Sequence, residues 1–258
     1  MDQPAALECP DSHREARIHR LVLWNIDLTL VDVARVTRAA YAEAFRAVAG
    51  RPLVQLPQMA GRTDSEIFFD ALALNDDPGM AGQGGEELLS RFLEELAAAF
   101  GARRDQLTEH GRLLPGARDA VAGVGRLPGV VQTVLTGAIR PTAIEKLRAF
   151  GLEKFFDTAI GGYGSQVYPK GALLLNARSR ASEKYDTDFS ERSTVYIADS
   201  ARDVEAARTG GARSIAVASG RSSASVLREA GADVVLDDLA DTAAVTGTVD
   251  RLTLVTAD

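Results

Sequence analysis

Residues 21–32 read LVLWNIDLTLVD, and the interpretation of the whole chain starts from this stretch. Its first four residues form an apolar run with the length of a short buried strand. Three short polar side chains follow at a spacing of two: Asn25, Asp27 and Thr29. Ligands of parallel sheets bind at the carboxyl ends of the strands. The stretch therefore predicts a strand that ends in a functional site.

The composition places limits on what kind of protein this is. The chain has 258 residues, of which 46% are hydrophobic and 25% charged, as in ordinary globular proteins. A net charge of −7 argues against a nucleic-acid surface, and no apolar run reaches the roughly 20 residues of a membrane span. Residues 1–20 are polar, without the apolar core of a signal peptide, so we expect a leader on a cytoplasmic protein. The single cysteine, Cys9, excludes an internal disulfide framework and a cysteine-based zinc site.

The first half of the chain is predicted to be helical after its opening strand. Apolar residues recur at helical spacing over three segments, 33–48, 64–74 and 86–100. Residues 75–85 are rich in Asp, Gly and Pro, which indicates a loop. No strand is expected between residues 34 and 113.

From Pro115 onward the pattern changes to alternating helices and strands. Helices are predicted over 117–127, 141–150, 172–182, 203–210 and 223–229, and strands over 130–135, 158–161, 194–198, 213–218 and 233–236. Such alternation implies right-handed crossovers and a parallel sheet with helices on both faces. We therefore predict an α/β fold with a Rossmann-like parallel sheet core and an inserted α-helical cap domain. The leader would be 1–20, the core 21–33 and 114–258, and the cap 34–113.

Polar clusters lie at or near the ends of several predicted strands. Phosphoryl transfer needs a nucleophile, a cation that spreads charge on the phosphoryl oxygens, and fixed hydrogen-bond donors. Mg²⁺ favours one or two carboxylates, with water and a phosphate oxygen completing its shell. Apart from the nucleophile, the clusters supply these parts: Asn25, Asp27 and Thr29; Thr136 and Gly137; Lys170; Asp199 and Asp203.

In order and spacing, these clusters resemble the motifs of the haloacid dehalogenase superfamily, whose first motif is Asp-x-Asp-x-Thr. The resemblance extends from Leu21 to about Leu236, and the helical insert is similar to the cap of the phosphoglycolate-phosphatase-like branch. It implies a Mg²⁺-dependent hydrolase of a small phosphorylated metabolite, and the composition leads us to expect no nucleic-acid or membrane partner.

The resemblance also implies a role for each matching position. Asn25 stands where the family has its nucleophile, which also ligates Mg²⁺. Asp27 matches the acid/base residue, whose main-chain carbonyl would ligate the metal. Asp199 matches a direct metal ligand and Asp203 its companion.

Further positions match groups that bind substrate. Thr136, next to Gly137, matches the hydroxyl that hydrogen-bonds the phosphoryl group. Lys170 matches the cation that pairs with both phosphate and nucleophile. Within the cap, Gly61-Arg62-Thr63-Asp64 resembles a substrate-facing turn, so Arg62 is a candidate for substrate binding.

The chain departs from the family pattern at two places. Lys170 is followed by Gly171, where the family usually has proline. More importantly, Asn25 replaces the attacking carboxylate, and an amide nitrogen is not a useful nucleophile towards phosphorus. We expect turnover to fall by several orders of magnitude, as when a nucleophile is removed elsewhere. Phosphate binding can survive, because one source of charge repulsion is gone.

Several functions remain open from the sequence. The first is a phosphatase impaired by Asn25, whether that residue is natural or engineered. The second is a non-catalytic protein that binds phosphate esters, and the third is a phosphosugar mutase on the same core. Dehalogenase chemistry is disfavoured, because dehalogenases need no metal and generally lack the second carboxylate represented here by Asp27. The sequence identifies neither the substrate nor the oligomeric state.

Overall fold

The structure, a computed structural model, describes residues 19–75, 85–165 and 169–253. A five-stranded sheet forms its centre, with strand order β4-β1-β5-β6-β7 and parallel pairing throughout. The strands are β1 (Arg20–Trp24), β4 (Val130–Val134), β5 (Thr194–Ala198), β6 (Arg213–Val217) and β7 (Val234–Leu236). Trp24, at the end of β1, is in register with Val134 and Ile197. The segments that follow these three strands therefore leave the sheet at one edge.

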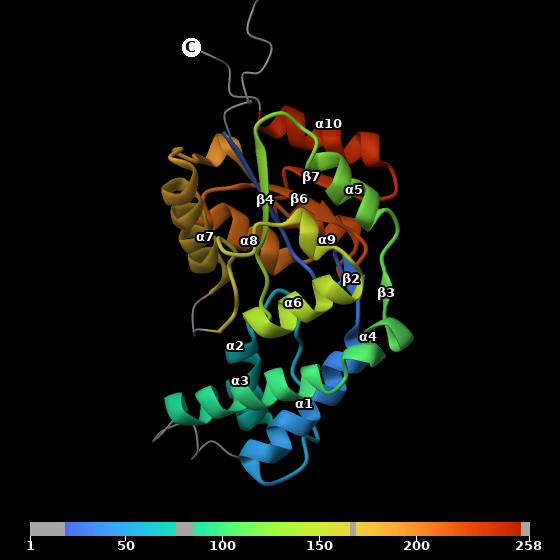
Figure 1. The fold of residues 1–258 in the computed structure, drawn as a ribbon, viewed down its shortest axis with the longest axis vertical. Coiled ribbons are helices and arrows are strands. Elements are labelled where there is room, and N and C mark those ends of the chain that lie inside the picture. Colours follow the sequence, from blue (N-terminus) through green and yellow to red (C-terminus); the bar gives the residue numbers. More distant parts are fainter. Residues whose placement is uncertain (1–18, 76–84, 166–168, 254–258) are drawn as a thin grey trace, which may run out of the picture.

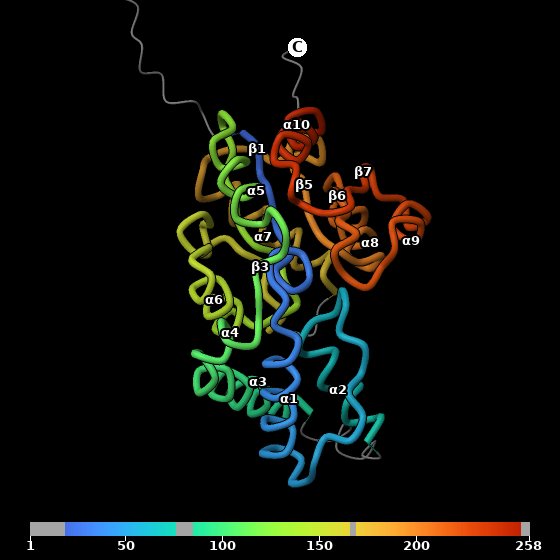
Figure 2. The backbone as a smooth tube through the Cα atoms, turned by 90° about the vertical axis from the view of Figure 1, so that its right-hand side faces the viewer, coloured from blue at the N-terminus to red at the C-terminus, as the bar shows by residue number. Residues whose placement is uncertain are grey.

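Helices cover both faces of this sheet, as Figure 2 shows. Side chains of β1 alternate between the two faces: Val22 and Trp24 join one apolar cluster, and Leu21 and Leu23 the other. The first cluster includes residues of α5 (Ala117–Val124), α6 (Arg140–Ala149) and α10 (Thr242–Leu252), and the second includes residues of α7 (Lys170–Tyr185) and α8 (Ala201–Gly210). Helix α9 (Ala224–Glu229) packs beside β7, and short 3₁₀ turns span Glu153–Phe155 and Glu191–Ser193.

Four further helices form a helical region beyond the carboxyl edge of the sheet, at the bottom of Figure 1. They are α1 (Ala34–Ala49), α2 (Asp64–Leu74), α3 (Gly85–Gly101) and α4 (Arg104–His110). Aromatic rings hold them together: Phe92 of α3 stacks on Phe68 with 4.4 Å between ring centroids and meets Tyr41 edge-on at 5.5 Å. A two-stranded antiparallel ribbon of β2 (Val31–Asp32) and β3 (Arg112–Leu113) joins the region to the core.

The predicted α/β class is confirmed, and most predicted elements are present within a few residues of their bounds. The strand predicted over 158–161 is wrong. There the Asp157 carboxylate accepts a hydrogen bond from the Ala159 amide at 3.2 Å, which favours a turn, and only Gly162 forms a single bridge to Leu135.

Other boundaries differ in smaller ways. Strand β3 lies inside the stretch predicted to lack strands, helices α4 and α10 were not predicted, and Arg20 belongs to β1 rather than to a leader. Most of the predicted leader, and residues 76–84 of the predicted loop, lie outside the described residues. Within the described part of the chain, no helix combines the length and apolar character needed to cross a membrane.

Candidate active site

Asn25 is the first residue after β1 and is almost fully buried. Its side-chain amide donates to the Asp199 carboxylate at 2.9 Å, to the Asp27 main-chain carbonyl at 2.9 Å and to the Thr29 hydroxyl at 3.3 Å. Its carbonyl oxygen accepts from the Lys170 ammonium at 3.3 Å. Three of the predicted clusters therefore meet at this one side chain.

Asp199 follows β5 and is buried at the same edge of the sheet. One of its oxygens also accepts from the Thr29 hydroxyl at 2.9 Å. Burial, and to a lesser extent the charge of Asp203, raise the pKa of Asp199 to about 7. The hydrogen bonds from Thr29 and Asn25 and the charge of Lys170 lower this pKa but do not outweigh burial. A neighbouring cation would stabilise the ionised form of this carboxylate.

Lys170 begins α7 and directs its ammonium into the site. Besides Asn25, it contacts a carboxylate oxygen of Asp203 at 2.7 Å and the Tyr196 hydroxyl at 3.4 Å. Asp203 also accepts from the hydroxyls of Tyr196, at 2.9 Å, and Ser200. Both oxygens of Asp203 are therefore occupied by these donors, and the carboxylate holds the Lys170 ammonium in place.

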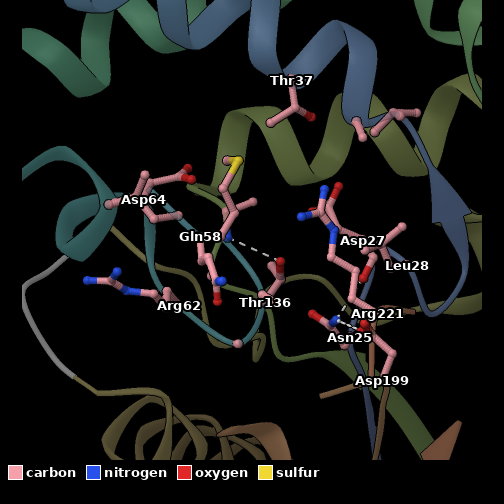
Figure 3. A pocket seen from close by; sticks show the side chains of 18 of the residues that line it. Asn25, Asp27, Leu28, Thr37, Gln58, Arg62, Asp64, Thr136, Asp199 and Arg221 are labelled. Atoms are coloured by element: carbon pink, nitrogen blue, oxygen red, sulfur yellow. Dashed lines mark hydrogen bonds between the residues drawn. The ribbon is translucent and has the colours of Figure 1, made fainter. Parts of the chain in front are cut away.

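Thr136 and Gly137 follow β4 and line the same cavity as Asn25. Figure 3 shows the Thr136 side chain between those of Gln58 and Asn25. The Thr136 hydroxyl oxygen accepts from the Ala138 amide at 3.1 Å, which leaves its hydrogen free for another acceptor. Gly137 lies against the helical region, since a Cβ there would come within 1.8 Å of the Arg62 carbonyl oxygen. Gly137 therefore allows a close main-chain contact that no other residue type would permit.

One cavity of about 400 Å³ between the sheet edge and the helical region is lined by six of the predicted residues, namely Asn25, Asp27, Thr136, Gly137, Lys170 and Asp199. Arg62 lines it too, but in Figure 3 its guanidinium points away from Thr136. It forms an ion pair with Asp70 of α2 at 2.5 Å. The structure thus brings the predicted residues of the core together and turns the charged end of Arg62 elsewhere.

Sequence reasoning missed Lys146, a second buried lysine in the same cavity. Its ammonium contacts both carboxylate oxygens of Asp27, at 2.7 and 2.8 Å, and lies 5.2 Å from the ring centroid of Phe100 in α3. In the sequence, Lys146 looks like one of several charged residues on an amphipathic helix. No local signal identified it, because its partner comes from a distant strand end.

Asp64, the first residue of α2, is predicted from the sequence only as part of a turn and the start of a helix, yet it connects the helical region to the core. Its carboxylate accepts from the Ile139 amide at 2.8 Å and from the Tyr41 hydroxyl, and its own amide donates to the Gly137 carbonyl at 2.7 Å. Burial raises the pKa of Asp64 to about 6, although the charge of Lys146 and both donors act in the opposite direction. Asp64 therefore fastens the helical region to the loop after β4.

The residues present fit a Mg²⁺ ion. Asp199 offers a carboxylate and Asp27 a main-chain carbonyl, and hard cations of this kind prefer oxygen ligands. Asn25 could add its amide oxygen only after the amide turns, because that oxygen now accepts from Lys170 while the NH₂ group faces Asp199 and the Asp27 carbonyl. Gly220 leaves room beside Asp199, since a Cβ there would come within 2.0 Å of its second carboxylate oxygen. Among the described residues, no group of three or more His, Cys, Asp or Glu side chains could hold a metal ion, at this site or elsewhere, so a cation here would depend on main-chain and amide oxygens besides Asp199.

Comparison with known proteins agrees with this fold. A curated relative named phosphoglycolate phosphatase 1, from Pseudomonas aeruginosa, is 27% identical over 87% of this chain and 79% of its own length. The crystal structure of a hydrolase from Pseudomonas syringae superposes with a TM-score of 0.63 at 21% identity, over 88% of this chain and 97% of that one. The structure of CbbY from Rhodobacter sphaeroides in complex with phosphate superposes with a TM-score of 0.58 at 22% identity, over 87% and 96%.

Residues 22–208 match the family described as haloacid dehalogenase-like hydrolase. This range includes every residue of the candidate site from Asn25 to Asp203, and it contains both the strand ends and the helical region that enclose the cavity. The chain belongs to the haloacid dehalogenase-like hydrolase family.

Proposed function

We propose that the chain is a Mg²⁺-dependent phosphatase scaffold for a small phosphorylated metabolite, with turnover held very low by Asn25. The observation that carries the proposal is the position of the Asn25 side chain, between Asp199 at 2.9 Å and Lys170 at 3.3 Å. A carboxylate at this position would face both a metal ligand and a cation able to hold a phosphoryl group. The name of the Pseudomonas aeruginosa relative supports a phosphate monoester as the substrate.

Each residue of the candidate site then has a defined role in binding or catalysis. Lys170 and the Thr136 hydroxyl bind the phosphoryl oxygens, and Asp27 exchanges a proton with the leaving-group oxygen. Asp199, the Asp27 carbonyl and Asn25 would hold Mg²⁺, which would spread the negative charge of the phosphoryl group. With an amide at position 25, the chain binds the ester and cannot form an acyl phosphate with it.

The substitution Asn25→Asp tests this proposal. We expect phosphate release from phosphoglycolate to increase by about a thousandfold or more, since a missing nucleophile costs at least that much in other enzymes. The activity of the Asn25→Asp protein should disappear on chelation of Mg²⁺ and return on its addition. Asn25→Ser is the matched control, because it removes the amide without supplying a carboxylate.

A second candidate, a non-catalytic binding protein for phosphate esters, is favoured by the full set of hydrogen bonds around Asn25. Both amide atoms have partners, so the residue is well accommodated where it stands. If the Asn25→Asp protein binds inorganic phosphate but releases none from any ester offered, the binding role is correct and the phosphatase proposal is wrong. An isomeric ester in place of free phosphate would instead identify a mutase.

A further inference from the structure

Lys146 is a buried cation at the wall of the cavity, and it already holds an anion. Its side chain is 3% exposed, whereas that of its partner Asp27 is 38% exposed. The carboxylate of Asp27 therefore borders open space, while the ammonium lies behind it beneath the ring of Phe100. An anion entering the cavity can reach the place that the Asp27 carboxylate now fills.

The ion pair with Lys146 prevents Asp27 from exchanging a proton with the leaving-group oxygen. Both of its oxygens contact the ammonium, at 2.7 and 2.8 Å, so neither is directed at a leaving-group oxygen. Asp27 must release Lys146 before it can face a substrate. A buried ammonium left without an anion is strongly unfavourable, so the release requires a replacement.

The charges around the cavity favour an anionic replacement. Five cationic side chains and three acidic ones line the cavity, although the whole chain carries a net charge of −7; the cations are Arg38, Arg62, Lys146, Lys170 and Arg221, and the acids Asp27, Asp64 and Asp199. Lys170 is placed for the phosphoryl group by its contact with Asn25. Lys146, beside Asp27, is the cation placed for a second negative group.

The Asp64 carboxylate also faces Lys146, but it does not need this lysine as a hydrogen-bond donor. The charge of Lys146 lowers the pKa of Asp64, which shows that the two interact. The Asp64 carboxylate nevertheless has two donors of its own, the Ile139 amide and the Tyr41 hydroxyl. Lys146 can therefore change its partner on the Asp27 side without disturbing the contact at Asp64.

We propose that Lys146 selects substrates by binding a carboxylate on the alcohol part of the phosphate ester, and that this carboxylate displaces Asp27 from the ammonium. This inference rests on the proposed function and adds to it the specificity-determining residue, Lys146, which would distinguish phosphate esters of small hydroxycarboxylic acids from esters without a carboxylate. Asn25 and Asp27 lie two residues apart, so an ester whose phosphoryl group meets Asn25 and Lys170 has its alcohol part beside Asp27. The substrate itself then frees Asp27 to face the leaving-group oxygen.

Equilibrium binding tests the inference on the chain as it stands, since Asn25 leaves the ester intact during a titration. Isothermal titration calorimetry would compare phosphoglycolate, ethyl phosphate and inorganic phosphate in the presence of Mg²⁺. Phosphoglycolate and ethyl phosphate have the same carbon skeleton and differ in the carboxylate. We expect phosphoglycolate to bind about 30-fold more tightly than ethyl phosphate, the scale of a buried charge pair.

Substitution of the lysine should remove this preference alone. In Lys146→Met, we expect phosphoglycolate to lose about 30-fold in affinity while ethyl phosphate and inorganic phosphate bind as before. Lys146→Arg, which keeps the charge, should retain part of the preference. Lys154→Met is the matched control, because Lys154 is exposed and also lies 5.2 Å from a phenylalanine ring, that of Phe155.

If Lys146 has only a structural role, Lys146→Met should weaken the binding of all three ligands together, or lower the unfolding midpoint, without changing the ratio of the affinities for phosphoglycolate and ethyl phosphate. A preference that is absent from the native chain, or that persists in Lys146→Met, overturns the inference while the proposed function stands. If the native chain binds none of the three ligands, and Asn25→Asp hydrolyses neither ester, both proposals fail. The ratio of kcat/KM for the two esters in Asn25→Asp, with and without Lys146→Met, checks the same selectivity during turnover.

Discussion

The NH₂ group of Asn25 lies between two oxygens that are candidate ligands for a cation, one from the Asp199 carboxylate and one from the Asp27 main-chain carbonyl. The amide donates to the Asp199 carboxylate and the Asp27 carbonyl, each at 2.9 Å, while its own oxygen faces Lys170. To ligate Mg²⁺ through that oxygen, the amide must turn and give up these hydrogen bonds. The residue thus lowers the affinity of the site for a cation, besides lacking the chemistry of a nucleophile.

We therefore expect Asn25→Asp to bind Mg²⁺ more tightly than the native chain, by about tenfold or more, because the site gains one negative charge and loses the competing donor. Calorimetric titration with Mg²⁺ alone, without any ester, measures this directly. Asp199→Asn in the Asn25→Asp background should reverse the gain. Equal affinities for Mg²⁺ in the native chain and in Asn25→Asp would show that the amide is no obstacle.

The individual residues of the site were predictable where a motif fixed them. Asn25, Thr136, Asp199 and Asp203 follow, or lie close to, apolar strands, and the parallel register brings those strand ends to one edge of the sheet. Lys170 is marked instead by its place at the start of a predicted helix. Lys146 has no such marker, because its role depends on the direction in which α6 crosses the sheet. Arg62 lies in the expected turn, yet its charged end pairs with Asp70, a choice of rotamer that the sequence does not reveal.

Among the elements, the start of α2 determines how the helical region is attached to the core. Thr63 caps the helix and forms a reciprocal capping box with Glu66, so the turn before it is well defined. This turn places Asp64 against Gly137 and Ile139, and Ser65 donates to the Gly164 carbonyl at 3.1 Å. The contact between the helical region and the core is therefore largely polar at this point. One of its polar groups, the Asp64 carboxyl, has a raised pKa and titrates near pH 6.

That titration gives a pH dependence to stability. The pKa of Asp64 is raised to about 6 in the folded protein, mainly by burial, from 3.8. Between these two pH values the folded chain retains a proton on Asp64 that the unfolded chain has released, so raising the pH favours unfolding. The free energy of unfolding of the native chain, relative to Asp64→Asn, should fall by up to about 3 kcal/mol between pH 4 and pH 6.5.

Urea unfolding of both proteins at several pH values tests this expectation. The difference between the two curves isolates Asp64, because the other carboxylates are common to both proteins. A difference that stays constant, or that increases with pH, would contradict the assignment of the raised pKa to this residue.

Elements were predictable from the sequence when their own residues decided them. The period-3.6 patterns of α1, α2 and α3, and the apolar runs of β1 and β5, specify these elements almost residue by residue. The sequence 158–161 failed as a strand because the side chain of Asp157 competes for its backbone. Gly171, unusual beside the motif lysine, is explained by the contact of α7 with α8, where a Cβ would lie 2.4 Å from the Thr209 hydroxyl.

At the scale of the whole molecule, the last helix supports the first strand. Helix α10 buries Val245 and Val249 completely and packs on α5 so closely that a Cβ on Gly123 would come within 2.8 Å of the Thr242 methyl group. Arg20, the first residue of β1, forms an ion pair with Asp250 at 2.6 Å. Because Asn25 directly follows β1, this distant helix contributes to holding the site in place. The family match ends at residue 208, before α10 begins.

A chain that ends at residue 240 should therefore lose much of its stability, although it keeps every residue of the candidate site. Removing the two buried valines alone forfeits about 3–6 kcal/mol of burial, against a total stability of about 5–15 kcal/mol for domains of this kind. We expect the shortened chain to show no cooperative urea transition, or one at a much lower midpoint, by near-ultraviolet circular dichroism. In the full-length chain, Val249→Ala should lose about 1–3 kcal/mol.

Gly247→Ala on the same helix is the matched control. A Cβ at Gly247 meets nothing within 4 Å, so the substitution should stabilise the protein by about 0.5–1 kcal/mol through helix propensity alone. If the shortened chain unfolds at the same urea midpoint as the full chain, α10 contributes nothing to the stability of the fold. The stability of the strand that precedes Asn25 must then come entirely from its neighbours in the sheet, β4 and β5.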